Sequence, residues 1–260
     1  MRPAILVLFS LWQAIPVHAV EQFRINVLER KAQDPSHYVQ GLEIHDGLLY
    51  VSTGQYGQSR LLRYDLDSGE RQVDRRLNPR LFGEGLTLFG DRIYQLTWKE
   101  GMLLEFSRDE MKALGWHPIP GMGWGLTNDG KHLIYTDGGD KLHYMDPETK
   151  RILRSVPVTE NGTPLPMINE LEWIDNKIWA NVYPTDRIVI IDPQSGEVTA
   201  SIDLKGLYSG KKPDSIHHAL NGIARNPDTG DIWVTGKLWP WMYRIELVPV
   251  QAPPPATESR

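Results

Sequence analysis

The chain has 260 residues, 40% of them hydrophobic, so it is long enough to bury a large core in a single domain. Its net charge of −5 excludes the broad basic surface of a nucleic-acid-binding protein. The absence of cysteine excludes disulfides, thiol catalysis, thiolate metal sites and a lipid-anchored cysteine. The 23 glycines and 19 prolines favour many turns over long helices.

The first 19 residues have the pattern of a secretory signal peptide. Arg2 supplies a positive charge, residues 4–12 form an apolar run too short to span a bilayer, and Val17-His18-Ala19 offers a cleavage site. A buried N-terminal helix is the alternative. We expect an exported protein, periplasmic or secreted from a bacterial cell, whose mature chain starts near Val20.

Five segments of the chain resemble one another. Each starts with a polar or aromatic residue, continues as a short apolar strand, turns at Gly, Asp or Asn, and returns as a second strand, which is typical of a β-hairpin. The segments are residues 40–54, 84–98, 124–138, 169–183 and 221–236. Their first residues are 44, 40, 45 and 52 positions apart, and repeats of ~40–45 residues are typical of four-stranded propeller blades.

A second pattern recurs in three of these repeats. Residues 60–69, 141–149 and 187–196 each predict a strand that ends in Asp and is followed by a turn. Three copies indicate an outer pair of strands beyond the first hairpin of a repeat.

The fifth repeat lacks one strand. After Asn221 only three strand-like runs remain, and in the last of them, residues 241–247, apolar side chains alternate strictly. Residues 23–28 alternate in the same way. We predict that this N-terminal strand pairs antiparallel with residues 242–247 and closes a five-bladed β-propeller, leaving no exposed sheet edge.

The predicted organisation is therefore all-β and has three parts. Residues 1–19 are the signal peptide, and residues 20–248 form a single five-bladed β-propeller catalytic domain. Residues 249–260 are too rich in proline and polar residues to pack, and we expect a disordered tail there.

The leading residues of the five segments are the first candidates for a site, because the first strand of each propeller blade lines the central channel. They are Gln40, Glu84, Trp124, Asn169 and Asn221. One carboxyl, three carboxamides and an indole at one mouth suit a site that orients a polar ligand. A turn cap is the alternative for each carboxamide, and for Asn221 the two roles are equally balanced. Glu84 has no local ion partner that would explain it structurally.

Further candidates lie at the ends of the second strands. They are Trp98, Trp179 and Lys237. Tryptophan in a propeller more often packs between blades, and we assign that role to Trp173, Trp233 and Trp241. A lysine at a strand end is normally solvated, but Lys237 lies in a run of Gly, Trp and Pro, which favours a place at the mouth.

These motifs match one known family in all five repeats. The matching segments are Gln40-Gly41-Leu42, residues 52–59, residues 82–87, Gly123-Trp124-Gly125-Leu126, residues 169–172, Trp179-Ala180-Asn181, residues 220–223 and residues 235–240. From about Tyr38 to Leu247 the chain closely resembles the glutaminyl-peptide cyclotransferases of the plant and bacterial type, as in papaya latex. The resemblance implies a five-bladed propeller that converts N-terminal glutaminyl residues of peptides and proteins to pyroglutamate and releases ammonia. It implies no metal and no other cofactor, unlike the unrelated zinc-dependent animal cyclases.

The resemblance also implies roles for the matching residues. Glu84 matches the family's acid/base carboxyl, and Phe82 matches an aromatic residue beside it. The pocket residues implied are Gln40, Trp98, Trp124, Asn169, Trp179 and Lys237. The chain has Tyr38 where the plant enzyme has Phe, a change that the pocket should tolerate. The resemblance assigns no role to the pair His217-His218.

These residue types suit the reaction. The α-amine of the substrate, whose pKa is ~7.7–8.0, must attack the side-chain amide carbon and expel ammonia. Both nitrogens are bound to one tetrahedral carbon, so one carboxyl, Glu84, can take the proton from the amine and give it to the leaving nitrogen. Lys237 or a carboxamide would stabilise the oxyanion, while Gln40 and Asn169 would hold the amide in a ring-like conformer. Aromatic walls would raise the pKa of Glu84 and Lys237 would lower it.

Two other functions fit the same residues. A metal-dependent propeller lactonase would bind Ca²⁺ through Glu84, Asn169 and Asn221, although Lys237 and three tryptophans would crowd the cation. A non-catalytic propeller would bind peptides without releasing ammonia. We expect a monomer that acts on peptides or proteins with N-terminal Gln and has neither a nucleic-acid partner nor, after signal cleavage, a membrane partner.

Overall fold

The computed structural model describes residues 19–208 and 216–250 of the chain. The predicted signal peptide up to residue 18 and residues 251–260 lie outside these ranges. Over the described residues the fold is all-β and contains no helix. Accordingly, no helix in residues 19–208 or 216–250 could cross a membrane.

Three sheets have four antiparallel strands each, paired in chain order. The first consists of β2 (Val39–His45), β3 (Leu48–Thr53), β4 (Arg60–Asp65) and β5 (Arg71–Arg76). The second consists of β6 (Gly83–Phe89), β7 (Arg92–Thr97), β8 (Met102–Ser107) and β9 (Ala113–Pro118). The third consists of β10 (Leu126–Asn128), β11 (Leu133–Tyr135), β12 (Lys141–Met145) and β13 (Ile152–Pro157).

The remaining long strands form an eight-stranded sheet. One half consists of β16 (Ile168–Ile174), β17 (Lys177–Val182), β18 (Arg187–Ile191) and β19 (Val198–Asp203). The other half consists of β20 (Leu220–Arg225), β21 (Ile232–Gly236), β22 (Trp241–Pro249) and β1 (Glu21–Ala32). Strand pairing joins the halves where Glu21 to Phe23 pair in parallel with Ala200 to Ile202. The short strands β14 (Thr159–Glu160) and β15 (Thr163–Pro164) form a separate hairpin.

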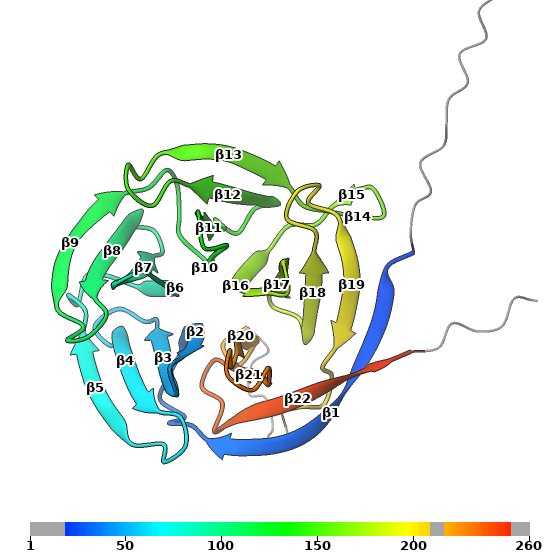
Figure 1. The fold of residues 1–260 in the computed structure, drawn as a ribbon, viewed down its shortest axis with the longest axis horizontal. Helices are drawn as coiled ribbons and strands as arrows, with labels where there is room; N and C mark the ends of the chain where they lie inside the picture. Colours follow the sequence, from blue (N-terminus) through cyan, green and yellow to red (C-terminus); the bar gives the residue numbers. More distant parts are fainter. Residues whose placement is uncertain (1–18, 209–215, 251–260) are drawn as a thin grey trace, which may run out of the picture.

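The sheets are arranged around a common centre, with β2, β6, β10, β16 and β20 innermost (Figure 1). Each innermost strand contacts the next, and β20 contacts β2, so the described strands close a ring. The hydrophobic core is divided accordingly: each of its clusters combines side chains from two neighbouring sheets or sheet halves. Among the tryptophans predicted to pack, Trp233 is buried in such a cluster, and Trp173 and Trp241 pack against others.

The N-terminal strand closes the ring as the sequence predicts. Ile25 pairs with Leu247 and Val27 with Ile245, in an antiparallel ladder that runs from Phe23 to Ala32. The predicted boundary at residue 248 is too early, because β22 continues to Pro249 and the Val250 N–H donates to Gln22 O at 2.8 Å. Proline is accepted there because it lies at the end of the strand.

Irregular pairing at the start of the innermost strands positions the leading residues. The register of β2, β6, β16 and β20 against its neighbour shifts at Gln40, Glu84, Asn169 and Asn221, respectively. A β-bulge of this kind bends the strand and redirects a side chain that regular pairing would send to the sheet face. The bulges therefore turn the leading side chains toward one end of the ring.

The glycine that follows a leading residue has a packing role. A Cβ on Gly85 would lie 2.5 Å from Leu126 N and 2.6 Å from Trp124 O, and a Cβ on Gly41 would lie 2.6 Å from Leu86 N. Adjacent innermost strands thus approach too closely for a side chain. In the fourth repeat Glu170 stands at this position, and its carboxylate accepts hydrogen bonds from Leu42 N at 3.3 Å and Ile223 N at 2.9 Å. Glu170 therefore links innermost strands that do not pair with each other.

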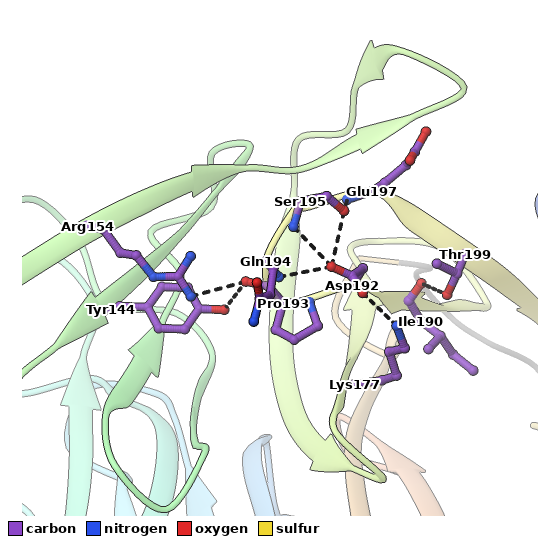
Figure 2. Close-up of polar contacts among 10 residues, drawn as sticks. All are labelled: Tyr144, Arg154, Lys177, Ile190, Asp192, Pro193, Gln194, Ser195, Glu197 and Thr199. Atoms are coloured by element: carbon purple, nitrogen blue, oxygen red, sulfur yellow. Dashed lines mark hydrogen bonds and ion pairs between the residues drawn. The ribbon is translucent and has the colours of Figure 1, made fainter. Parts of the chain in front are cut away.

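The predicted Asp turns between outer strands have a common structure, which Figure 2 shows for Asp192. Its Oδ1 accepts hydrogen bonds from Gln194 N and Ser195 N at 3.0 Å, and Lys177 Nζ donates to Oδ2 at 2.6 Å. Burial raises the pKa of Asp192, but the Lys177 and backbone hydrogen bonds outweigh it and lower the pKa to about 2. Tyr144, from β12 of the preceding sheet, donates to Pro193 O at 2.6 Å, so the turn also joins neighbouring sheets.

Two carboxyls, the buried Glu172 and the half-buried Glu43, lie at the opposite end of the innermost strands from the leading residues. Glu43 and Glu172 line a cavity of about 280 Å³. Burial raises the pKa of Glu43 to about 7, and burial together with the charge of Glu43 raises the pKa of Glu172 well above its usual range. The folded protein therefore binds protons at this cavity more tightly than the unfolded chain does.

Replacing Gly85 with Ala should lower the free energy of unfolding by about 2–4 kcal/mol, because the new methyl group would force neighbouring backbone apart. Gly115→Ala is the matched control, because a Cβ at Gly115 meets no atom within 4 Å. Urea denaturation of both variants measures the difference. Equal stability of the two variants would contradict the packing argument.

Replacing Glu43 with Gln should stabilise the protein at pH 8 by at least about 1 kcal/mol and leave it nearly unchanged at pH 4. The pKa of Glu43 is raised in the folded protein, so the protonated carboxyl does not destabilise the fold. The stability of the wild type falls as the pH rises from about 4.5, the ordinary pKa, through about 7, the pKa in the folded protein. Denaturation series at the two pH values test this. A variant with the same pH dependence as the wild type would overturn it.

Candidate functional site

A cavity of about 320 Å³ opens at the end of the ring where the leading residues lie. It is lined by seven of the eight side chains predicted for the site: Gln40, Phe82, Glu84, Trp98, Trp124, Asn169 and Lys237. These residues come from β2, β6, β16 and the segments that follow β7, precede β10 and follow β21. Residues nearly 200 positions apart in the sequence thus meet at one site.

Glu84 is held by a chain of carboxamides. Its side chain is only 4% exposed, and Gln40 Nε2 donates to its Oε1 at 3.0 Å. Asn221 Nδ2 in turn donates to Gln40 Oε1 and to Val39 O, both at 3.0 Å. Asn221 does not line the cavity, so it orients Gln40 from behind and does not contact a ligand. The carboxyl of Glu84 therefore has a fixed direction.

The environment of Glu84 favours its protonated form. Burial raises its pKa well above the usual range, the positive charge of Lys237 lowers it less, and the negative charge of Glu100 raises it further. The sequence left open whether the dry walls or Lys237 would dominate. In the structure, burial by the dry walls has the larger effect on the pKa of Glu84.

Lys237 is as deeply buried as Glu84, with 3% of its surface exposed. Its Nζ lies 4.8 Å from the ring centre of Tyr38 and 4.7 Å from that of Tyr183. Burial lowers its pKa to about 8, although Glu84 raises it. Burial thus outweighs the mutual attraction for both groups, and the pKa of each is shifted in the direction that favours its neutral form.

Aromatic rings form one wall of the cavity around Phe82. Phe82 makes edge contacts with Tyr38 and Tyr56, with ring centres 6.1 and 5.4 Å apart, and a tilted contact with Trp98 at 5.4 Å. Glu100 fixes this wall, because its carboxylate accepts hydrogen bonds from Tyr56 Oη at 2.9 Å and Phe82 N at 3.3 Å. The wall excludes water from one side of Glu84.

Two polar atoms in the lining lack a partner in the described part of the chain. They are the buried Trp124 Nε1, a donor, and Asn169 Oδ1, an acceptor. A buried polar atom without a hydrogen bond is costly, so such atoms in a cavity indicate contacts that a ligand completes. A primary carboxamide has both complementary groups, a carbonyl acceptor and an N–H donor.

Trp179 does not line the cavity, which corrects its predicted role in the pocket. It lies on β17 and is buried with Ile174, Ile188 and Trp239 in the hydrophobic cluster between the two halves of the large sheet. The strand alternates, so neighbouring Ile178 and Ala180 point into the adjacent cluster. Trp179 belongs with the tryptophans that pack.

Five lining residues were not predicted for the site: Tyr38, Gln55, Tyr183, Ile216 and His217. Gln55 lies inside a recognised motif and Tyr38 lies two residues before one, so their closeness to the site could have been found there. Tyr183 follows the second strand of the fourth repeat, the same place that Trp98 and Lys237 occupy in other repeats, which is a signal that sequence reading overlooked. No pattern in the sequence distinguishes Ile216 or His217.

No group of three or more His, Asp or Glu side chains is arranged to hold a metal ion in residues 19–208 and 216–250. For the proposed calcium ligands, the structure brings Glu84 and Asn169 into one cavity but directs the Asn221 amide to Gln40 and Val39.

Known proteins resemble this chain along nearly its whole length. The sequence model of the glutamine cyclotransferase family matches residues 3–247. A glutaminyl-peptide cyclotransferase from Arabidopsis thaliana is 38% identical over 232 residues, which cover 86% of this chain and 72% of that protein. The crystal structure of a glutaminyl cyclase from Myxococcus xanthus superposes with a TM-score of 0.83 at 32% identity, covering 89% of this chain and 100% of that one.

Replacing Trp179 with Leu should lower the free energy of unfolding by about 2–4 kcal/mol, because it leaves a cavity in the core. Trp98→Leu is the matched control at the cavity wall and should cost less than about 1.5 kcal/mol, since part of its ring is already exposed. Chemical denaturation compares the two. A larger loss for Trp98→Leu would return Trp179 to the list of site candidates.

Proposed function

The chain belongs to the glutamine cyclotransferase family, and we propose that Glu84 and Lys237 perform the cyclisation of N-terminal glutaminyl residues to pyroglutamate in this protein. The observation that carries the proposal is a buried, oriented carboxyl that faces a buried ammonium in a cavity with unpaired amide-binding atoms. The substrates would be peptides or proteins whose first residue is glutamine.

The substrate side-chain amide fits the two unpaired atoms of the cavity. Its carbonyl oxygen would accept from Trp124 Nε1, and its N–H would donate to Asn169 Oδ1. Both contacts draw the amide carbon toward Glu84, which lines the same cavity. Holding the flexible side chain in a bent conformer removes much of the entropic barrier to ring closure.

The chemical step then needs one proton that travels between two nitrogens. The α-nitrogen forms a bond to the amide carbon, and the carbonyl π electrons move onto oxygen. Glu84 takes a proton from the attacking nitrogen and gives it to the amide nitrogen, after which the carbon–nitrogen bond breaks and ammonia leaves. A protonated Glu84 beside a neutral α-amine has the same number of protons as an ionised Glu84 beside a protonated α-amine. The raised pKa of Glu84 is therefore compatible with a reaction that starts from either pair.

Lys237 would stabilise the oxyanion of the tetrahedral intermediate. A preformed charge in a dry site needs no reorganisation when negative charge develops, which makes it more effective than the same charge in water. Its pKa of about 8 keeps most of the ammonium charged at neutral pH and predicts a loss of turnover at higher pH.

We also infer that the ring is a five-bladed β-propeller. The support is the strand order, which divides into four-stranded units with β1 as the outermost strand of the last one, and the closed ring of innermost strands. The large sheet would then be two blades joined by the short parallel contact of β1 with β19.

We propose, from the first 19 residues alone, that the protein is exported. A positive charge followed by a short apolar run and a small-residue cleavage site supports a periplasmic or secreted enzyme. We also propose that the protein acts as a monomer.

Replacing Glu84 with Gln should lower kcat by ~10²-fold or more with little change in KM, because the amide keeps the volume but cannot shuttle a proton. The assay is ammonia release from a Gln-initiated dipeptide. Glu43→Gln is the matched control, since this half-buried carboxyl also has a raised pKa but lies at the other end of the ring, so the variant should retain the wild-type kcat. Near-normal turnover of Glu84→Gln would remove Glu84 from the mechanism.

Activity should survive exhaustive chelation, because the proposed steps use only protein side chains. Ammonia release would be measured before and after dialysis against a strong chelator, then after addition of Ca²⁺ and Zn²⁺. Loss of turnover that either metal restores would favour the lactonase-type site. Peptide binding without ammonia release in the untreated protein would favour the non-catalytic alternative.

A further inference from the structure

Tyr183 connects three parts of the site. It follows β17, and its N–H donates to Met167 O at 2.9 Å, which anchors the backbone. Its ring lies 4.7 Å from Lys237 Nζ and meets Trp124 edge-on at 90°, with ring centres 5.8 Å apart. Its hydroxyl donates to Ile216 O at 3.3 Å.

A second ring contacts the same ammonium. Tyr38 lies 4.8 Å from Lys237 Nζ and comes from the segment before β2, on a different sheet from Tyr183. Tyr38 is braced in turn by Phe82 at 6.1 Å and by His217 at 6.4 Å. Two separately anchored rings therefore flank the charge of Lys237.

We infer that Tyr183 is a positioning residue that, with Tyr38, keeps the Lys237 ammonium charged and directed into the cavity. The inference rests on the proposed function, because it explains how Lys237, the proposed partner of the oxyanion, stays charged in a dry site. Tyr183 acts through Lys237 and is not itself a proton donor in the reaction.

The charge cycle of Glu84 is the physical reason for such rings. The titratable groups that share the cavity with Lys237 are Glu84 from β6, Tyr38, Tyr183 and His217, while Glu100 acts on Glu84 from the rim. Glu84 gains and loses its charge in every turnover, so it cannot stabilise Lys237 steadily. The face of an aromatic ring attracts a cation at all times without neutralising it. The rings thus oppose the burial that lowers the pKa of Lys237 and leave its full charge for the oxyanion.

The comparison of Tyr183→Phe with Tyr183→Leu isolates this effect. Phe keeps the ring face and the edge contact with Trp124 and loses the hydroxyl with its hydrogen bond to Ile216, whereas Leu removes the ring. A cation–π contact in a desolvated site is strong enough to shift a lysine pKa by about one pH unit. In Tyr183→Leu the alkaline limb of the kcat profile should therefore move about 0.5–1 pH unit lower, and kcat at pH 8 should fall about 2–5-fold. Tyr183→Phe should follow the wild type.

The titration of Lys237 gives a readout that does not depend on turnover. In protein labelled with ¹³Cε-lysine, the Lys237 signal is identified by its loss in Lys237→Met, and its midpoint is followed in the wild type and both Tyr183 variants. We expect a midpoint near 8 in the wild type and in Tyr183→Phe, and a lower one in Tyr183→Leu. Thermal unfolding verifies that each variant is folded. Should Tyr183→Leu not fold, the pair Tyr38→Phe and Tyr38→Leu tests the other ring in the same way.

An unchanged Lys237 midpoint in a folded Tyr183→Leu protein would overturn the inference. A midpoint that shifts equally in Tyr183→Phe and Tyr183→Leu would overturn it too, since the hydroxyl and not the ring would then matter. If the wild type released no ammonia, the proposed function would fail, whereas a ring-dependent midpoint of Lys237 would still support the role of Tyr183.

Discussion

The close approach of the innermost strands is the constraint on which both the fold and the site depend. At Gly41 and Gly85 the neighbouring backbone leaves no space for a Cβ, so the ring closes tightly around its axis. Bulges beside these glycines turn Gln40 and Glu84 out of the regular ladder and toward the cavity. Glu170 uses the same position differently and links β16 to β2 and β20 through their backbone N–H groups. The residues that close the ring thus lie next to the residues that form the site.

Tight closure also sets the electrostatics of the cavity. Glu84 and Lys237 are almost fully buried, and burial moves the pKa of each toward the neutral form although the two attract each other. A carboxyl with a raised pKa can both donate and accept a proton near neutral pH, which a proton shuttle requires. Glu43 and Glu172, at the other end of the strands, also have raised pKa values. What distinguishes Glu84 is its cationic neighbour and its unpaired polar surroundings.

Seven of the eight residues proposed for the site from the sequence line one cavity. The sequence predicted the repeat and the closing pair of strands, because hydrophobic alternation and turn residues are local signals. It did not predict the bulges, which depend on contacts between sheets. The same limit explains the error at Trp179: alternation places it on one face of a strand, but only the packing of the sheets decides that this face is core and not cavity. The ring contacts of Tyr183 join segments from three of the repeats and leave no pattern along the chain. The balance between burial and Lys237 at Glu84 likewise required the exposed fractions of both side chains.

The titration of the Glu84 carboxyl tests the account most directly. In protein labelled with ¹³Cδ-glutamate, the Glu84 resonance is identified as the one missing from Glu84→Gln, and its chemical shift is followed from acid to alkaline pH. The account predicts a midpoint well above 4.5, because burial outweighs the attraction of Lys237. A midpoint at or below 4.5 would mean that Glu84 is a permanently ionised partner of Lys237, and it would contradict its role as the group that carries the proton between the two nitrogens.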